Sequence, residues 1–252
     1  MLLAVDIGNT RIKLGVFDSG KLISKLAIPT ERSVSAETLL KVIGHRITDT
    51  VEAVIVCSVV PEVDAAFREF VLGHFEVEPL IVENDWDLGM TVTYEPLSAT
   101  GSDRLVNAFS AVETYGAPCI VCSFGTAFTI DVIDKHRVLV GGLIAPGIDT
   151  LSAALASSAS KLPEVTLVKP TSLIQKTTTG CIQAGVFYGF IGMAEYLLSA
   201  TLDEFGGEAK IIATGGSAKL FAENTAKSLV IDDNLLLNGL QKLYARHTAR
   251  PF

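Results

Sequence analysis

Two stretches of the chain repeat one unusual pattern, and this repeat constrains the fold more than any other feature. Residues 2–28 contain three apolar runs separated by the polar turns Asp6-Ile7-Gly8-Asn9-Thr10 and Asp18-Ser19-Gly20-Lys21. Residues 119–145 follow the same order, with turns at Ser123-Phe124-Gly125-Thr126 and Asp134-Lys135-His136-Arg137. Each stretch therefore predicts three antiparallel strands joined by two tight hairpins.

The first hairpin of each stretch has the composition of a phosphate-binding loop. Glycine has no Cβ, so backbone N–H groups can approach phosphate oxygens closely, and a threonine hydroxyl adds a further donor. Two such hairpins facing each other across a cleft would hold a nucleoside triphosphate. A plain β-turn is the alternative for residues 6–10, because Gly-Asn is ordinary hairpin chemistry; the second copy favours phosphate binding.

The remainder of the chain alternates predicted helices with short apolar strands, which indicates a layered α/β fold. Each half reads as a three-stranded antiparallel unit, a helix, a parallel strand and a helix. We therefore expect a duplicated actin-like, ribonuclease-H-like architecture, with one domain at residues 1–115 and the other at 116–252. Helices are predicted at 35–46, from Pro61, and at 103–112, 150–158, 181–205, from 217 and 233–247, and strands at 51–60, 78–84 and 210–214.

Composition and charge exclude several kinds of function. The 252 residues carry a net charge of −8 and a pI near 5.0, which argues against binding the phosphate backbone of nucleic acid. The N-terminus has no basic region of a signal peptide, and no apolar run approaches the ~20 residues that cross a bilayer. We expect a cytoplasmic protein without a membrane partner and with reduced cysteines. Cys119 and Cys122 lie in a predicted strand without a second zinc-ligand pair, so buried core thiols are expected.

Three further features suggest a site. Asp6 ends a strand, where a carboxylate can hold Mg²⁺ through water, and Lys13 could reach a phosphate or simply face solvent. Gly101-Ser102-Asp103-Arg104 opens a helix, where Asp103 is either a partner of the helix dipole or a group that accepts a proton from a hydroxyl. Gly215-Gly216 follows a strand and would pass beneath a purine or ribose.

Two features lie around the predicted helix at 181–205. Thr177-Thr178-Thr179 caps that helix or binds substrate. Gly185, Gly189 and Gly192 share one helix face, which permits close packing in the core or against a second subunit.

Together these motifs resemble the type III pantothenate kinases over nearly the whole chain. The resemblance rests on Asp6 to Lys13, Ser58-Val59-Val60-Pro61, Tyr94-Glu95-Pro96, Gly101 to Ala108, Gly125-Thr126-Ala127 and Gly141 to Gly147. It implies transfer of the ATP γ-phosphoryl group to the primary hydroxyl of pantothenate, the first step toward coenzyme A. It also implies Mg²⁺, a monovalent cation such as K⁺ or NH₄⁺, and a homodimer with partner residues near the pantothenate site.

The resemblance assigns roles residue by residue. Asp103 matches the general base of the family. Pantothenate-contacting positions match Tyr94, Gly101, Ser102, Asp103, Arg104 and Thr178. ATP-contacting positions match Asp6, Ile7, Gly8, Asn9, Thr10, Arg11, Ile12, Lys13 and Thr126, with Asp6 as the Mg²⁺ position.

Two positions depart from the pattern. Ser123 stands where the family has an aspartate that binds the monovalent cation, and Phe128 replaces a usual threonine. A carboxylate in contact with a unit cation attracts it by about 4 kcal/mol at an effective dielectric near 20. Its loss would abolish K⁺ binding, leave a weak site of neutral oxygens, or mark a protein that has given up catalysis.

Two other functions therefore remain open beside the kinase. Ser123 motivates a catalytically impaired family member that acts as a regulatory or transcription-accessory protein, although retention of Asp6, Asp103, Arg104 and Thr126 argues against it. The other alternative is a kinase or phosphatase of the same fold acting on a sugar or an acetate-like acid, which the segment from Tyr94 to Arg104 disfavours.

Overall fold

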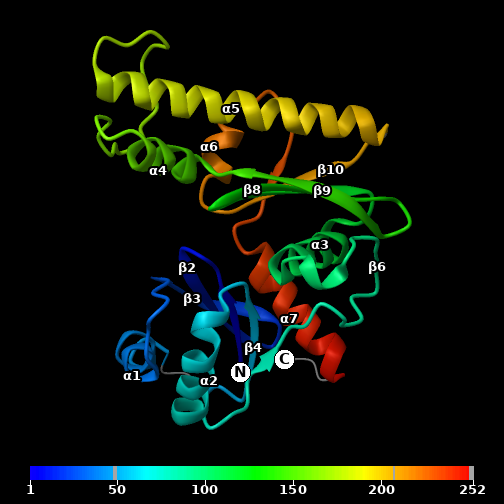
Figure 1. Ribbon diagram of the computed structural model, residues 1–252. Coiled ribbons are helices and arrows are strands. Elements are labelled where there is room, and N and C mark those ends of the chain that lie inside the picture. The colour runs from blue at the N-terminus through cyan, green and yellow to red at the C-terminus, as the bar shows by residue number, and fades with distance from the viewer. Residues whose placement is uncertain (48–49, 207, 250–252) are drawn as a thin grey trace. The chain divides into compact units, whose positions relative to one another are not determined.

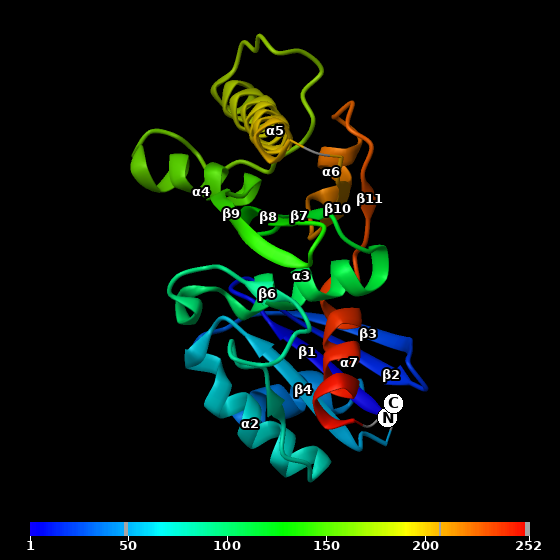
Figure 2. The same cartoon turned by 90° about the vertical axis from the view of Figure 1, so that its right-hand side faces the viewer.

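The chain forms two units, each built around its own sheet. The computed structural model describes residues 1–47, 50–206 and 208–249. Unit 1 comprises Met1–Thr114 and Asn234–Phe252, and unit 2 comprises Tyr115–Asp233. Figures 1 and 2 show the elements of each unit in two views.

The sheet of unit 1 has the strand order β3-β2-β1-β4-β5. Its strands are β1 (Leu2–Ile7), β2 (Arg11–Asp18), β3 (Lys21–Pro29), β4 (Ala53–Ser58) and β5 (Leu80–Ile81). β1 pairs with β2 and β2 pairs with β3 antiparallel, whereas β4 lies parallel to β1. The parallel pair requires a crossover, which α1 (Ala36–Leu39) and the π-helical turn η1 (Leu40–Gly44) supply.

The alternation of side chains along β1 divides the core of unit 1 between the two faces of the sheet. Leu3, Val5 and Ile7 belong to the cluster that α1, η1 and α2 (Pro61–Phe75) cover. Leu2, Ala4 and Asp6 therefore point to the opposite face. α7 (Leu235–Thr248) contacts β1, β2 and β4, and Leu237 of α7 lies close to Gly15 of β2.

The helix α3 (Ser102–Tyr115) packs against α7 within unit 1. A Cβ added to Gly239 of α7 would lie 2.8 Å from Cβ of Ser110 and 3.0 Å from Cγ1 of Val106, so glycine permits the close approach. The Ser110 hydroxyl also donates to the carbonyl oxygen of Leu235 at 2.6 Å. The short elements β6 (Thr91–Val92) and η2 (Leu97–Ala99) precede α3.

Unit 2 repeats the arrangement of unit 1. Its strands lie in the order β11-β10-β7-β8-β9, with bounds β7 (Cys119–Phe124), β8 (Ala127–Ile133), β9 (Val138–Pro146), β10 (Lys210–Thr214) and β11 (Val230–Ile231). β7, β8 and β9 pair antiparallel in sequence, and β10 lies parallel to β7, as β4 does to β1. This repeat confirms the duplicated fold predicted from the sequence.

Three helices cover one face of the unit 2 sheet: α4 (Ile148–Ser158), α5 (Thr178–Phe205) and α6 (Ala218–Ala222). An aromatic cluster fills the space beneath them, where Phe124 stacks on Phe128 and on Phe221 with ring centroids 4.8 Å apart in each pair. Phe190 of α5 meets Phe124 and Phe128 edge to face. The aromatic residue that replaces the family threonine at 128 is therefore a core residue.

The helix α5 departs from the expectation that no segment approaches membrane-spanning length. By length and composition alone, α5 is long and apolar enough to cross a membrane. Core helices of globular proteins share these properties. Its apolar side chains that are buried in the core of unit 2 include Ile182, Val186, Phe187, Phe190, Ile191 and Leu198.

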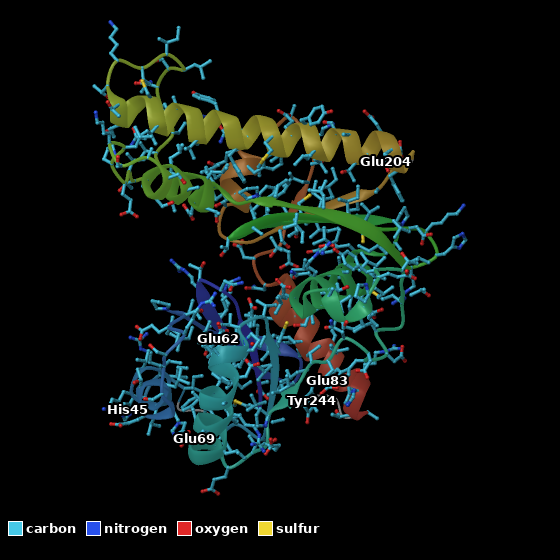
Figure 3. All side chains as sticks on the ribbon, in the orientation of Figure 1. His45, Glu62, Glu69, Glu83, Glu204 and Tyr244 are labelled. Carbon is cyan, nitrogen blue, oxygen red and sulfur yellow. The ribbon has the colours of Figure 1, made fainter. Side chains whose placement is uncertain are left out.

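Other predictions differ from the structure in detail. The last helix, assigned from the sequence to the second domain, belongs to unit 1, because its buried leucines pack on the first sheet. The predicted strand at 78–84 shrinks to two residues, and the predicted helix at 35–46 ends in a π-helical turn. The thiols of Cys57, Cys119 and Cys122 are buried, as expected of core cysteines. His45 is exposed at the end of η1 (Figure 3).

Candidate functional site

The loop Gly8–Thr10 between β1 and β2 is held by hydrogen bonds from both sides. The N–H of Gly8 donates to the carbonyl oxygen of Arg11 at 3.1 Å. Thr30, just after β3, donates its hydroxyl to the Gly8 carbonyl at 2.6 Å and its N–H to the Thr10 carbonyl at 3.0 Å. A loop fixed in this way presents a preorganised backbone, which is what close binding of a phosphate requires.

Asp6 is a buried carboxylate at the end of β1, with 6% of the residue exposed. Burial raises its pKa from the ordinary 3.8 to about 6, an effect that the nearby Lys13 opposes and Asp103 reinforces. The Nζ of Lys13, on β2 directly opposite in register, lies 3.4 Å from Asp6 Oδ2. A second cation, in addition to Lys13, would stabilise the charged form of a carboxylate desolvated in this manner.

Asp103 lies in the first turn of α3, and its charge contributes to raising the pKa of Asp6. Burial is the main cause that raises the pKa of Asp103, while the backbone N–H and the charge of Arg104 lower it. Its Oδ1 accepts a hydrogen bond from the N–H of Arg104 at 2.9 Å. A partly buried carboxylate of this kind suits proton acceptance from an alcohol, because its raised pKa brings it closer to that of the donor.

The residues around Asp103 fix the start of α3 against the end of β4. The Ser102 hydroxyl donates to the carbonyl oxygen of Ser58 at 3.0 Å and lies 3.3 Å from the thiol sulfur of Cys57. Burial, followed by the charge of Asp6, raises the pKa of that thiol, so Cys57 stays protonated and is no nucleophile. Ser102 therefore acts as a tether that aligns Asp103.

Arg104 and Tyr94 form the second half of the candidate substrate segment. The guanidinium carbon of Arg104 lies 5.1 Å from the centroid of the Tyr94 ring, and only 6% of Arg104 is exposed. Such cation–π stacking holds a guanidinium in a fixed plane, where it can bind a carboxylate in bidentate fashion.

The second loop, in unit 2, resembles the first in its hydrogen bonding. Gly125 donates its N–H to the carbonyl oxygen of Ala127 at 3.0 Å, as Gly8 does to Arg11. The carbonyl oxygen of Thr126 accepts from the N–H of Gly147 at 2.9 Å and from the Thr150 hydroxyl at 2.6 Å. Ser123 lies on β7 two residues before Gly125.

Two further predicted positions also lie in unit 2. Gly215 has a left-handed φ of 97°, and a Cβ there would lie 2.5 Å from the carbonyl oxygen of Phe124, so glycine is required. Thr178 is the first residue of α5, exposed and directly after the N-cap Thr177, whose hydroxyl accepts from the Gly180 N–H at 3.1 Å. Thr177 therefore caps the helix, and the side chain of Thr178 remains available to a ligand.

Unit 1 thus brings Asp6, Lys13, Asp103 and Arg104 into one polar cluster, whereas Ser123, Thr126 and Thr178 belong to unit 2. The side chains of Ile7 and Ile12 lie in the core, so these two residues can offer a nucleotide only their backbone. Thr30 and Arg32, both in contact with the first loop, were missed from the sequence. They follow β3 without any recognisable motif, and only the pairing of β2 with β3 brings them to the loop.

The donor set near Asp6 fits a magnesium ion. Mg²⁺ prefers carboxylate oxygens and retains water, and such a cation would stabilise the charged form of the buried Asp6, whose pKa the charge of Asp103 raises further. Among the described residues, no cluster of three or more His, Cys, Asp or Glu side chains forms a ready-made metal site.

Comparison with known proteins decides the family. The family model described as type III pantothenate kinase matches residues 2–200. The chain is 37% identical to the type III pantothenate kinase of Brevibacillus brevis, over 98% of this chain and 99% of that protein. The chain belongs to the type III pantothenate kinase family. Another member, from Bacillus cytotoxicus, is also 37% identical, over 98% of this chain and 97% of that protein.

Solved structures place this family member in the actin-like fold. One is the activator of 2-hydroxyisocaproyl-CoA dehydratase from Clostridium difficile with bound ADPNP, with a TM-score of 0.56, 13% identity, and coverage of 98% of this chain and 95% of that one. Another is component A of (R)-2-hydroxyglutaryl-CoA dehydratase from Acidaminococcus fermentans, with a TM-score of 0.54, 13% identity and 98% coverage of both chains. At these identities the likeness shows the shared fold alone.

Proposed function

We infer that this chain is a pantothenate kinase, which phosphorylates pantothenate with ATP to 4'-phosphopantothenate in coenzyme A biosynthesis. The observation that carries this conclusion is the nearly full-length match to type III pantothenate kinases. The buried Asp6, the proton-accepting Asp103 and the fixed Arg104 supply the groups that such a reaction needs. No observation favours the regulatory alternative.

The site residues have the following roles in this proposal. The backbone of the loops around Gly8 and Thr126, with Lys13, binds the phosphates of ATP and offsets their charge. Asp103 orients the primary hydroxyl of pantothenate and takes its proton as the new P–O bond forms. Arg104, Tyr94 and Thr178 bind the remainder of pantothenate, the guanidinium pairing with its carboxylate.

Asp6 would hold Mg²⁺, through water, together with phosphate oxygens, and the ion would neutralise charge on the transferred group. The monovalent cation has a weaker case. Ser123 offers a neutral hydroxyl where a carboxylate would attract K⁺ or NH₄⁺, so the residues do not fit a tight site for such an ion. We propose that turnover depends little on K⁺ or NH₄⁺.

We further propose a homodimer in the cytoplasm, without nucleic-acid or membrane partners. A Cβ added at Gly185, Gly189 or Gly192 of α5 would meet nothing within 4 Å, and Tyr196 on the same helix is 71% exposed. This small-residue face and its exposed tyrosine suit close packing against a second copy. Light scattering on the purified protein tests the dimer; a monomer at micromolar concentration would contradict it.

A coupled ADP-release assay tests the activity. We expect ADP release that depends on pantothenate, and none above background with acetate, glucose or N-acetylmannosamine as acceptor. ADP release with one of these acceptors and not with pantothenate would assign the chain to another reaction of the same fold.

A further inference from the structure

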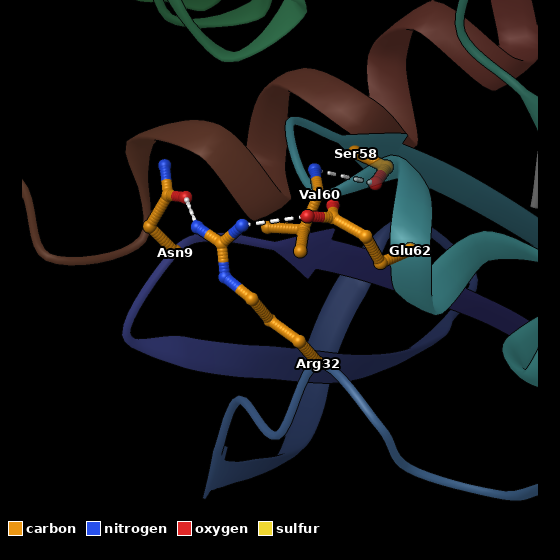
Figure 4. A network of polar contacts seen from close by, with 5 residues as sticks. All are labelled: Asn9, Arg32, Ser58, Val60 and Glu62. Carbon is orange, nitrogen blue, oxygen red and sulfur yellow. Dashed lines mark hydrogen bonds and ion pairs between the residues drawn. The ribbon is translucent and has the colours of Figure 1, made fainter.

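Arg32, just after β3, joins the first phosphate loop to the start of α2 (Figure 4). Its Nη1 donates to Oε1 of Glu62 at 2.6 Å, and its Nη2 donates to Oδ1 of Asn9 at 3.3 Å. The side chains of Arg32 and Glu62 are 63% and 49% exposed, so this ion pair contributes little to folding stability. The ion pair instead holds the guanidinium of Arg32 where it contacts the side-chain amide of Asn9.

The contact fixes which way the amide of Asn9 faces. A guanidinium group has only donors, so the atom of the amide that meets it must be the oxygen. The amide nitrogen of Asn9 therefore points away from Arg32, as Figure 4 shows. Its two N–H donors are presented at the tip of the loop between β1 and β2, on the side that does not face Arg32.

Glu62 can hold the guanidinium in place because hydrogen bonds fix the backbone at the start of α2, where Glu62 lies. It lies in the first turn of α2, directly after the corner formed by Ser58 and Val60. The Ser58 hydroxyl donates to Oδ1 of Asp64 at 2.5 Å and accepts from the N–H of Val60 at 3.2 Å. The corner after β4 is thereby linked, through Glu62 and Arg32, to the tip of the phosphate loop.

We propose that Arg32 is a positioning residue that acts through Asn9, holding the amide N–H donors of Asn9 toward a phosphate oxygen of bound ATP. This inference rests on the proposed function, since it requires that the loop binds a nucleotide. A donor that contacts the phosphate both before and during transfer contributes uniform binding, so its loss raises KM for ATP more than it lowers kcat.

The variants Arg32→Ala and Glu62→Gln test the contacts through which Asn9 is oriented. Each should raise KM for ATP by about 3- to 10-fold, the effect of one ordinary hydrogen bond, with little change in kcat. Arg68→Ala is the matched control: Arg68 lies on α2 and makes an exposed ion pair with Glu78, at 2.5 and 3.0 Å. It should leave both constants unchanged.

Substitutions of Asn9 separate the amide donors from the contact with Arg32. Asn9→Asp keeps an acceptor for Arg32 but replaces the donors with a carboxylate oxygen, so it should raise KM for ATP more than Asn9→Ala does. In the Asn9→Ala background, Arg32→Ala should have no further effect, because Arg32 acts through that amide. An undiminished effect in that background would overturn the inference.

Calorimetry with a non-hydrolysable ATP analogue distinguishes failure of the positioning role of Arg32 from failure of the proposed function. If the wild-type protein binds the analogue and Arg32→Ala binds it equally well, the positioning role is overturned and the proposed function stands. If the wild-type protein binds no nucleotide, the proposed function is overturned and this inference with it. Circular dichroism and thermal unfolding of each variant confirm that it folds, with Glu62→Gln available should Arg32→Ala fail to do so.

Discussion

The Nζ atom of Lys13 lies 3.4 Å from Oδ2 of Asp6, and the two residues face each other across the pairing of β1 with β2. Lys13 is 43% exposed at its side chain, whereas Asp6 is 8% exposed, so the carboxylate bears most of the cost of desolvation. The pKa of Asp6 is accordingly raised to about 6 despite its partner. Keeping this carboxylate charged at neutral pH therefore costs folding stability.

The pH dependence of stability should reveal the raised pKa of Asp6. Because the folded protein binds this proton more tightly than the unfolded chain, the contribution of Asp6 to stability is greatest below pH 3.8 and is lost as pH rises through about 6. Asp6→Asn removes this loss, so at pH 8 the variant should be more stable than wild type by about 1–3 kcal/mol, though inactive.

Urea unfolding of both proteins between pH 4 and 8 measures this difference. The gain in stability of Asp6→Asn should shrink as pH falls toward 4, where the wild-type carboxyl is protonated. An Asp6→Asn variant less stable than wild type at pH 8 would show that the ion pair with Lys13 outweighs burial.

Asp103→Asn should lower kcat about 10²- to 10⁴-fold, the usual contribution of a general base. The asparagine oxygen can still accept the hydrogen bond from the N–H of Arg104, so folding should be unaffected. Glu113→Gln, an exposed change near the end of the same helix, is the control and should have near-wild-type turnover. Steady-state kinetics at saturating ATP and pantothenate decide the matter; comparable turnover in both variants would remove Asp103 from the chemistry.

Gly147→Ala should disrupt the second loop. An added Cβ would lie 2.0 Å from the carbonyl oxygen of Gly125 and 2.7 Å from that of Thr126, so the backbone of the loop has to move. We expect a loss of roughly 2–4 kcal/mol in unfolding free energy, typical of severe overpacking, together with weaker ATP binding.

Gly73→Ala is the control for that substitution, because a Cβ at Gly73 in α2 would meet nothing within 4 Å. It should leave stability unchanged or raise it by about 0.5–1 kcal/mol, since alanine favours a helix over glycine. Chemical denaturation measures both variants, and equal stabilities would argue against a rigid second loop.

Ser123 predicts a weak response to monovalent cations. Turnover of the wild-type protein should change little when NaCl is replaced by KCl or NH₄Cl at constant ionic strength. Ser123→Asp adds the carboxylate that the resemblance leads one to expect, and should make turnover respond to K⁺. A strong K⁺ requirement in the wild-type protein would show that neutral oxygens suffice at this position.

Local sequence patterns predicted most of the fold, because strand alternation and tight turns are short-range signals. The repeated hairpins around Asp6 and Gly125 predicted the loop between the first two strands of each unit, and with it the duplication. The final helix was assigned to the wrong unit, since its apolar face shows that it packs but not against which sheet. The same limit applies to Arg32, whose role follows from a contact across the chain with Glu62 and Asn9.

The most direct test of the central claim is ³¹P nuclear magnetic resonance of the purified protein with ATP, Mg²⁺ and pantothenate. We predict that the γ-phosphate signal of ATP decays while one phosphomonoester signal, that of 4'-phosphopantothenate, grows at the same rate. ATP that remains intact, or that yields only inorganic phosphate, would contradict the claim.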